Sequence, residues 1–392
     1  MLVQHKLMLW VLALLCLIWV LFRTRLFQFL DHKSNAKFRD EHLDGLRCFL
    51  ALLVVFSHYP YSYAYFQGKV WSWESIAEYP VFIKMGSFGV ALFFMISGYL
   101  FASVQPKSWL LFYQKRFYRI APIFLLSSIC CIVIAFYLQR NHIQTLDIQS
   151  TLNQIYLWFD LGIIGQKPTL FGFPDSYLIN AGVTWTLFWE WAFYFSLPVL
   201  FLIRDKIGII KLALAILFIC IYFVSLHRGF WSVLISFFTI GAVAKELAPK
   251  IVISKKGCDL GIVLAILFMF AAADDIYNMV YLPVMAILFI LIAMGGDIFG
   301  LLRAKAFVRL GAASYSIYLL HGIAWFGLNK YIQLQQLTLS RTQYTVCSTA
   351  VLLLLLLVCC LTYYYIEKPC MAWGRRPSKW IKALRQDAAC RR

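Results

Sequence analysis

Residues 44–58 of the chain read DGLRCFLALLVVFSH, an apolar run with charged or titratable side chains at both ends. Arg47 and His58 are three helical turns apart, so in an α-helix they share one face and lie about 16 Å apart along the axis. Asp44 precedes Arg47 by one turn and falls near the same face. Ionisable groups are costly inside an apolar helix, and each of them is therefore a candidate functional residue.

Similar apolar runs fill most of the 392-residue chain. Hydrophobic residues make up 62% of it, aromatic residues 18% and charged residues only 14%, and the mean hydropathy is +0.75. A soluble domain carries about 25% charged residues. The composition therefore excludes an ordinary cytosolic enzyme, a disordered protein and a DNA-binding domain. The net charge of +18 is spread over short gaps between the apolar runs, so phospholipid head groups, and not nucleic acid, are the expected partners.

A helix needs about 20 apolar residues to cross a bilayer. The sequence thus predicts an all-α fold, a polytopic bundle of transmembrane helices. The predicted spans lie near residues 7–28, 44–62, 86–104, 119–138, 183–203, 208–226, 230–247, 258–273, 279–297, 309–329 and 343–366. No small-residue cleavage site follows the first of them, which favours a retained helix over a signal peptide. The long gap 139–182 is rich in glycine and proline and predicts a structured loop.

Basic residues are distributed unequally between alternate gaps. One set of gaps, together with the C-terminal tail, carries 26 of the 36 Lys and Arg, whereas the alternate set carries 8. Basic loops remain in the cytoplasm, so the tail is predicted to be cytoplasmic and the loop 139–182 to face outward. This orientation places Arg47 near the inner end of its helix and His58 near the outer end.

Arg116 and Arg119 are one helical turn apart at the predicted inner membrane face. Two guanidinium groups pointing the same way can grip a phosphate. The alternative is a simple positive anchor for the helix that follows. The spacing alone does not decide between these two interpretations.

Glu190 lies in an aromatic stretch, TWTLFWEWAFY at residues 184–194, near the predicted outer face. Its carboxylate is a candidate either to orient His58 or to bind sugar hydroxyls. Trp185 and Tyr194 are candidates to contact a sugar ring. The alternative is an interfacial aromatic belt with a snorkelling carboxylate.

Ser314, Tyr318 and His321 fall on one face of the tenth predicted span. His321 lies near mid-membrane, where it needs a polar partner. A structural polar network is the favoured interpretation, and His321 is also a candidate substrate contact. The eleven cysteines show no C-x-x-C spacing and no metal-ligand pattern, so no metal is expected.

Six motifs in order resemble the acyltransferase 3 family of integral membrane enzymes, which acylate surface polysaccharides and other acceptors. They are Asp44-Gly45-Leu46-Arg47 with His58, the run from Gly89 to Tyr99, Arg116-x-x-Arg119 with Pro122, Trp185 to Tyr194 with Pro198, Gly311 to His321, and Ile366-Glu367-Lys368-Pro369. The resemblance implies a ten-helix domain at about residues 41–370. An additional N-terminal helix and basic cytoplasmic linker would precede it at 1–40, and a basic cytoplasmic tail would follow at 371–392.

The resemblance also implies that His58 is catalytic and that Arg116 and Arg119 handle the acyl donor. The predicted function is O-acyl transfer, with acetyl expected, from cytoplasmic acyl-CoA to a sugar hydroxyl of a surface polysaccharide or its lipid-linked precursor. The predicted location is a bacterial inner membrane. Arg47 joins the arginine pair as a contact for the CoA phosphates, and His58 with Glu190 forms the catalytic group. Direct transfer and a covalent acyl-enzyme relay both stay open.

Two other classes of protein fit the sequence less well. A transporter or flippase for a lipid-linked glycan would line its path with the same polar stripe, but no internal repeat is visible. A purely structural scaffold would leave Arg47, His58 and Glu190 without a use. The identity of the acceptor and the oligomeric state cannot be read from the sequence.

Overall fold

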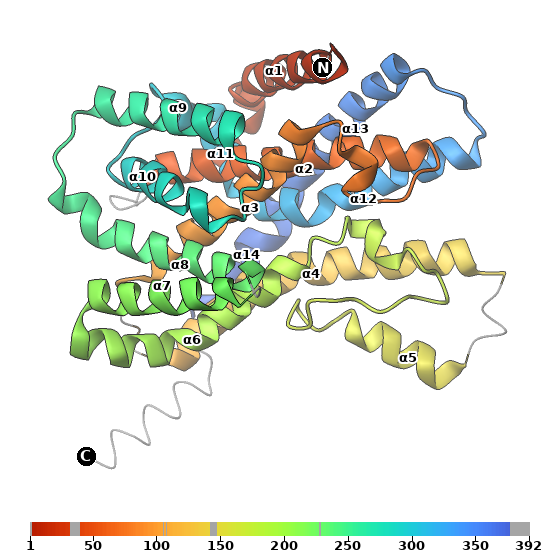
Figure 1. The fold of residues 1–392 in the computed structure, drawn as a ribbon. Helices are drawn as coiled ribbons and strands as arrows, with labels where there is room; N and C mark the ends of the chain where they lie inside the picture. Colours follow the sequence, from red (N-terminus) through yellow and green to blue (C-terminus); the bar gives the residue numbers. More distant parts are fainter. Residues whose placement is uncertain are drawn as a thin grey trace.

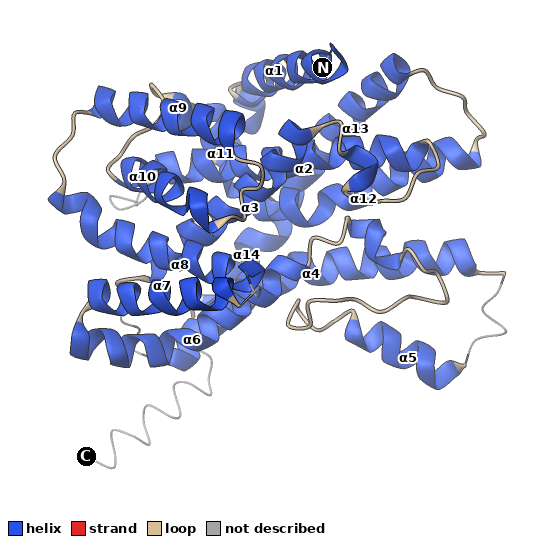
Figure 2. Cartoon of the chain, viewed as in Figure 1, coloured by secondary structure: helices blue, strands red, loops and turns tan. Residues whose placement is uncertain are grey.

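The computed structural model describes residues 2–31, 40–104, 106, 108–141, 147–226 and 229–376. Throughout these segments the chain forms helices and loops and no strands, which confirms the all-α prediction (Figure 2). The α-helices are α1 (Leu2–Phe22), α2 (Glu41–Phe66), α3 (Pro80–Phe101), α4 (Trp109–Gln139), α5 (Ile148–Leu157), α6 (Trp185–Ile207), α7 (Ile209–Ser225), α8 (Gly229–Leu247), α9 (Lys255–Ala272), α10 (Leu282–Ala293), α11 (Lys305–Ala312), α12 (Ser314–Leu334), α13 (Arg341–Thr362) and α14 (Lys368–Gly374). A π-helical turn, Tyr363–Glu367, joins α13 to α14. The other short helices are 3-10 turns at Arg25–Leu30, Glu74–Ile76, Ser176–Asn180, Ala248–Lys250, Met279–Tyr281 and Leu301–Arg303.

Each predicted span coincides for most of its length with a helix. Within the described segments, seven helical stretches are long and apolar enough to cross a membrane: Gln4–Phe22, Glu41–Phe66, Pro80–Phe101, Trp109–Gln139, Trp185–Ile207, Gly229–Lys250 and Arg341–Gly374. Two further apolar helices, Ile209–Ser225 and Met279–Ala293, are shorter. The polytopic architecture agrees with the sequence. The exact number of membrane crossings, ten in the domain and one additional N-terminal helix, stays a prediction.

Polar side chains at the helix starts fix where several helices begin. Ser108, Asp147 and Ser254 each accept a hydrogen bond from a backbone N–H in the first turn of α4, α5 and α9. Ser340 and Gln343 form a reciprocal capping box at the start of α13. These caps satisfy backbone groups that would otherwise lack partners where the chain enters a helix.

Helix α2 lies at the centre of the bundle, where it packs against α3, α11 and α12 (Figure 1). The approach of α11 is so close that a Cβ atom on Gly311 would lie 1.9 Å from the Asp44 carbonyl oxygen. A similar approach joins α3 to α8, since a Cβ atom on Gly98 would lie 2.0 Å from the Phe238 carbonyl oxygen. Small residues in these motifs thus let the backbones meet, as expected for helices in a membrane.

The described part of the long segment after α4, residues 147–182, is folded, as predicted, and it contains α5. A second small core holds it against the C-terminal halves of α4 and α12, with Trp158, Leu170 and Ile179 packed near Cys131 and Phe326. Figure 1 shows α5 and the loop that follows it alongside α4. This segment therefore packs as an ordered unit on α4 and α12.

The additional N-terminal helix packs onto the same core. Trp10 of α1 donates a hydrogen bond to the Thr349 hydroxyl of α13 over 2.8 Å. Arg309 of α11 is buried and donates to the Phe22 and Thr24 carbonyl oxygens, both at 2.7 Å. It also binds both carboxylate oxygens of Asp31, and the linker that continues at 32–39 lies outside the described residues. A cation at the C-terminal end of α1 complements the helix dipole.

Candidate active site

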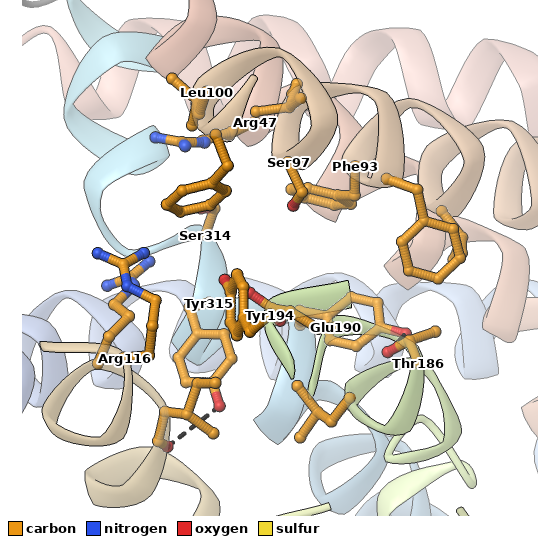
Figure 3. Close-up of a pocket in the computed structure, with 18 residues that line it drawn as sticks. Arg47, Phe93, Ser97, Leu100, Arg116, Thr186, Glu190, Tyr194, Ser314 and Tyr315 are labelled. Carbon is orange, nitrogen blue, oxygen red and sulfur yellow. Dashed lines mark hydrogen bonds between the residues drawn. The ribbon is translucent and has the colours of Figure 1, made fainter. Parts of the chain in front are cut away.

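Helices α3, α4, α6 and α12 surround a cavity of about 150 Å³ (Figure 3). Its lining is Arg47 from α2, Val90, Phe93, Phe94, Ile96, Ser97, Leu100 and Phe101 from α3, Arg116, Arg119 and Ile120 from α4, Thr186, Leu187, Glu190 and Tyr194 from α6, and Ser314, Tyr315 and Tyr318 from α12. In Figure 3 the arginines gather at one end, and Thr186 and Phe93 lie at the other. The cavity is thus cationic at one end and mainly apolar along its length.

A second cavity of about 630 Å³ shares its cationic wall with the first. The shared residues are Arg47, Leu100, Phe101, Arg116 and Arg119. The two cavities therefore adjoin at the arginines, and we call this region the arginine end.

The two arginines of α4 have different surroundings. Arg119 forms an ion pair with Glu367 at 2.6 Å, and its guanidinium lies 5.1 Å from the Tyr315 ring. Arg116 instead lies over the aromatic rings of Phe101 and Tyr194, at 5.0 and 5.8 Å from the ring centres. Both side chains line the cavity, as the one-turn spacing predicts.

The π-helical turn between α13 and α14 brings Glu367 to Arg119. Glu367 is fully buried and also accepts a hydrogen bond from Ser316 of α12. Such single-turn bulges within helices are rare and occur often at functional sites. Sequence reasoning treated Glu367 as part of a terminal motif and missed its ion pair, because the bulge shifts the helix register.

Glu190 lies within the cavity and accepts a hydrogen bond from the Tyr194 hydroxyl one turn along α6. The role predicted for it as the partner of His58 gains no support from the described contacts. His58 pairs instead with a histidine on α12.

That pairing is direct. His321 Nε2 lies 3.2 Å from His58 Nδ1, and the ring centres are 4.9 Å apart. His321 is fully buried, whereas His58 is half-buried. The buried polar partner expected for His321 is therefore the other predicted histidine.

Hydrogen bonds to backbone carbonyls define the tautomers of both rings. His321 Nδ1 lies 2.7 Å from the Tyr318 carbonyl oxygen, so Nδ1 carries the proton and Nε2 is an acceptor in the neutral ring. His58 Nδ1 lies 2.8 Å from the Val54 carbonyl oxygen and faces His321 Nε2, so it also carries a proton. This assignment leaves His58 Nε2 unprotonated and able to act as a general base.

Tyr318 separates the histidine pair from the cavity. Its ring lines the cavity and lies 6.2 Å from the His321 ring, centre to centre. Its hydroxyl lies 3.0 Å from the Thr186 hydroxyl of α6. Tyr318 therefore lies next to Thr186, at the end of the cavity away from the arginines, and next to His321.

Two aromatic rings that do not line the cavity lie next to His58. The Tyr61 and Trp71 rings lie 5.7 and 6.1 Å from the His58 ring and 5.5 Å from each other, all with similar tilts. In a single stack of three rings, the two outer rings would be about twice as far apart as neighbouring rings. The three distances here are nearly equal, so His58, Tyr61 and Trp71 do not form a single stack. They are therefore staggered side by side, and Tyr65 meets the edge of Trp71 at 6.3 Å. We call Tyr61, Tyr65 and Trp71 the aromatic group.

The structure thus divides the predicted site residues into two sets and leaves one residue, Trp185, outside both. Arg47, Arg116, Arg119, Glu190 and Tyr194 line the cavity. His58 and His321 form the pair beyond Tyr318, and Trp185 lies apart against Phe230 at 5.9 Å. The roles assigned to these residues stay predictions. Trp71 was missed because it lies in the loop between α2 and α3, outside any apolar span.

No group of three or more His, Cys, Asp or Glu side chains in the described segments has the arrangement of a metal site. The residues near the cavity suit a different ligand. Guanidinium groups bind phosphate, and the apolar walls suit a slender chain.

A bundle of apolar helices around a cavity with a cationic end is typical of an integral membrane protein. A family model described as an acyltransferase domain matches residues 40–365. The chain belongs to this family, the acyltransferase 3 family, and it is a membrane acyltransferase. No match was found among curated proteins or among solved structures.

Proposed function

We propose that the protein transfers an acyl group, expected to be acetyl, from cytoplasmic acyl-CoA to a sugar hydroxyl of a surface polysaccharide or its lipid-linked precursor. One observation carries the proposal. The cavity begins at Arg47, Arg116 and Arg119 and ends at Tyr318, directly before the His58–His321 pair. The phosphates of a thioester donor can therefore bind at one end of the cavity, and the base lies next to the other end.

The donor enters from the arginine end. The charge asymmetry of the loops predicts that this end faces the cytoplasm, where CoA is available. Its phosphates bind the arginines, and the pantetheine arm extends between α3 and α6 past Glu190. The thioester then reaches Tyr318, and this side chain moves aside for the thioester to meet His58.

The chemical step needs only this donor and a hydroxyl. His58 Nε2 removes the proton from the acceptor hydroxyl as its oxygen attacks the thioester carbonyl carbon. The tetrahedral intermediate collapses, the C–S bond breaks, and the leaving thiolate takes the proton from His58. The hydrogen bonds of His58 Nδ1 to the Val54 carbonyl and to His321 stabilise the transient imidazolium.

The acceptor approaches from the opposite side, along the aromatic group. An aromatic ring offers an apolar face to the C–H groups of a pyranose, and tyrosine adds a hydroxyl. Trp71 and Tyr61 lie next to the proposed base, so a sugar held on them brings a hydroxyl within reach of His58. This arrangement favours a glycan over a lipid or a peptide as the acceptor.

The experiment is mass spectrometry of surface glycans from cells that make the intact protein, the His58→Ala variant, the His5→Ala variant or none. His5 is exposed on α1 and serves as the matched control. We expect an acyl mass increment with the intact protein and with His5→Ala only, at equal protein levels in the membrane. Identical glycans in all four strains would contradict the proposal, and an increment that persists in His58→Ala would contradict the assignment of the base.

A further inference from the structure

The C-terminal segment lines the arginine end, although it follows the family match, which ends at residue 365. Lys368, Met371 and Ala372 of α14, and Arg375 directly after it, line the 630 Å³ cavity. Arg375 is exposed, and Lys368 is half-buried with its ammonium 5.1 Å from the Tyr364 ring. The cavity is therefore completed by residues outside the matched domain.

The position of this segment is well defined. Helix α14 lies against the first half of α4, the helix that carries Arg116 and Arg119 (Figure 1). Gln114 of α4 donates hydrogen bonds to the carbonyl oxygens of Gly374 and Arg376, at 3.2 and 2.7 Å. Gly374 also packs directly on the Tyr118 side chain. The C-terminal segment with Lys368 and Arg375 is therefore packed directly on α4, which carries the arginine pair.

We call Arg47, Arg116 and Arg119 the core arginines. Carboxylates of the protein balance their positive charges. Arg119 pairs with Glu367 at 2.6 Å, and Arg47 pairs with Asp44 at 3.3 Å. Glu190 lines the same cavity and is a third carboxylate, so the formal charges of the three arginines and three carboxylates cancel. CoA carries a diphosphate and a separate 3′-phosphate, so these residues alone do not supply the positive charge that would neutralise it.

Lys368 and Arg375 add two positive charges that these carboxylates do not balance. We propose that these two side chains bind the phosphates of the CoA nucleotide, and that the core arginines receive the diphosphate next to the pantetheine arm. This inference rests on the proposed use of acyl-CoA. Arg375 can bind a phosphate with two parallel hydrogen bonds, whereas Lys368 acts as a point charge. The C-terminal segment is then a specificity element that selects CoA over donors without a nucleotide.

The test is equilibrium binding of three ligands to the purified protein in detergent: CoA, 3′-dephospho-CoA and pantetheine. The variants are Lys368→Gln, Arg375→Gln and the double variant. The matched control is Lys256→Gln, an exposed lysine at the start of α9. Pantetheine has no phosphate, so its binding reports on the apolar part of the cavity and on correct folding.

We expect the double variant to bind CoA at least tenfold more weakly than the intact protein and to bind pantetheine equally well. Its preference for CoA over 3′-dephospho-CoA should fall, and added salt should weaken CoA binding less than in the intact protein. Unchanged CoA affinity, or an equal loss for CoA and pantetheine, would overturn the inference while leaving the donor assignment standing. If the intact protein binds none of the three ligands, the donor assignment fails as well.

Discussion

His321 Nε2 accepts from His58 Nδ1 across 3.2 Å, and this contact joins α12 to α2 at the centre of the bundle. Because His321 Nδ1 is held by the Tyr318 carbonyl, the acceptor nitrogen always points at His58. In many hydrolases a carboxylate orients the catalytic histidine in this way. Here a neutral imidazole takes the same position, and we predict that His321 is a positioning residue.

We predict that His321→Ala lowers kcat more than it changes KM for either substrate. The loss should be smaller than the about 10²- to 10⁴-fold loss expected for His58→Ala, because the Val54 carbonyl still holds the His58 ring. His321→Gln places an amide oxygen where Nε2 was and should restore part of the rate. The measurement is steady-state kinetics in proteoliposomes. A purely structural role predicts instead that both variants lose protein and that the remaining protein has normal kcat.

The ion pair between Arg119 and Glu367 should be important for stability as well as for donor binding. Glu367 is fully buried, so Arg119→Ala leaves an unpaired charge inside the bundle and is expected to cost about 3–5 kcal/mol. Replacing both residues by apolar ones, Arg119→Met with Glu367→Leu, should recover most of that loss. Thermal unfolding in detergent measures both effects.

The matched control for this prediction is the exposed pair of Lys250 and Glu246, whose charged atoms lie 2.5 Å apart. Lys250→Ala should change the free energy of unfolding by about 0–1 kcal/mol. Equal destabilisation by Lys250→Ala and Arg119→Ala would show that burial of Glu367 contributes nothing. A double apolar variant less stable than Arg119→Ala would lead to the same conclusion.

Trp71 and Trp73 provide a matched test of the aromatic group. Trp71 lies beside His58 and Tyr61, whereas Trp73, two residues further along the same loop, is 64% exposed. We predict that Trp71→Ala raises KM for the glycan acceptor several-fold and leaves KM for acyl-CoA unchanged. Trp73→Ala should change neither constant. Equal effects of the two variants on the acceptor KM would exclude a specific sugar contact at Trp71.

Much of this architecture follows from sequence patterns, because apolar runs and helical spacing determine local structure. The one-turn spacing of Arg116 and Arg119 does place both side chains in the cavity. The spacing of Arg47 and His58 gives a shared face, but it does not reveal that Tyr318 separates their sites. Contacts between distant helices depend on tertiary packing, so the His58–His321 pair was not predicted.

Register shifts and loops limit sequence reasoning in the same way. A regular helix through residues 363–367 would give Glu367 a different direction, and the π-helical turn cannot be read from hydropathy. Trp71 comes close to His58 only because the loop after α2 folds back on that helix. Lys368 and Arg375 were treated as parts of a terminal motif and a tail because their contact with the cavity depends on how α14 packs on α4.

The pair of Asp31 and Arg309 predicts a dependence of stability on pH. Arg309 donates hydrogen bonds to both carboxylate oxygens of Asp31, at 2.6 and 2.9 Å, and these bonds hold the pKa of Asp31 below its usual value. A carboxyl group with a lowered folded-state pKa stabilises the protein above its unfolded-state pKa, which is about 3.9 for Asp. That stabilisation is lost as the pH falls through the folded-state value. The intact protein should therefore unfold at a lower temperature near pH 3 than near pH 6.

Asp31→Asn removes the titrating group at this contact between α1 and α11. The variant should unfold at a lower temperature than the intact protein near pH 6, and the difference between them should shrink near pH 3. Asp205→Asn is the control, since Asp205 is 57% exposed in its side chain and pairs with its neighbour Arg204. The measurement is the thermal unfolding temperature of the intact protein and both variants at the two pH values. A constant difference in unfolding temperature between the intact protein and Asp31→Asn at the two pH values would mean that the Asp31 carboxylate does not hold α1 on the bundle. The hydrogen bond of Trp10 and those that Arg309 donates to the helix-end carbonyls would then be sufficient.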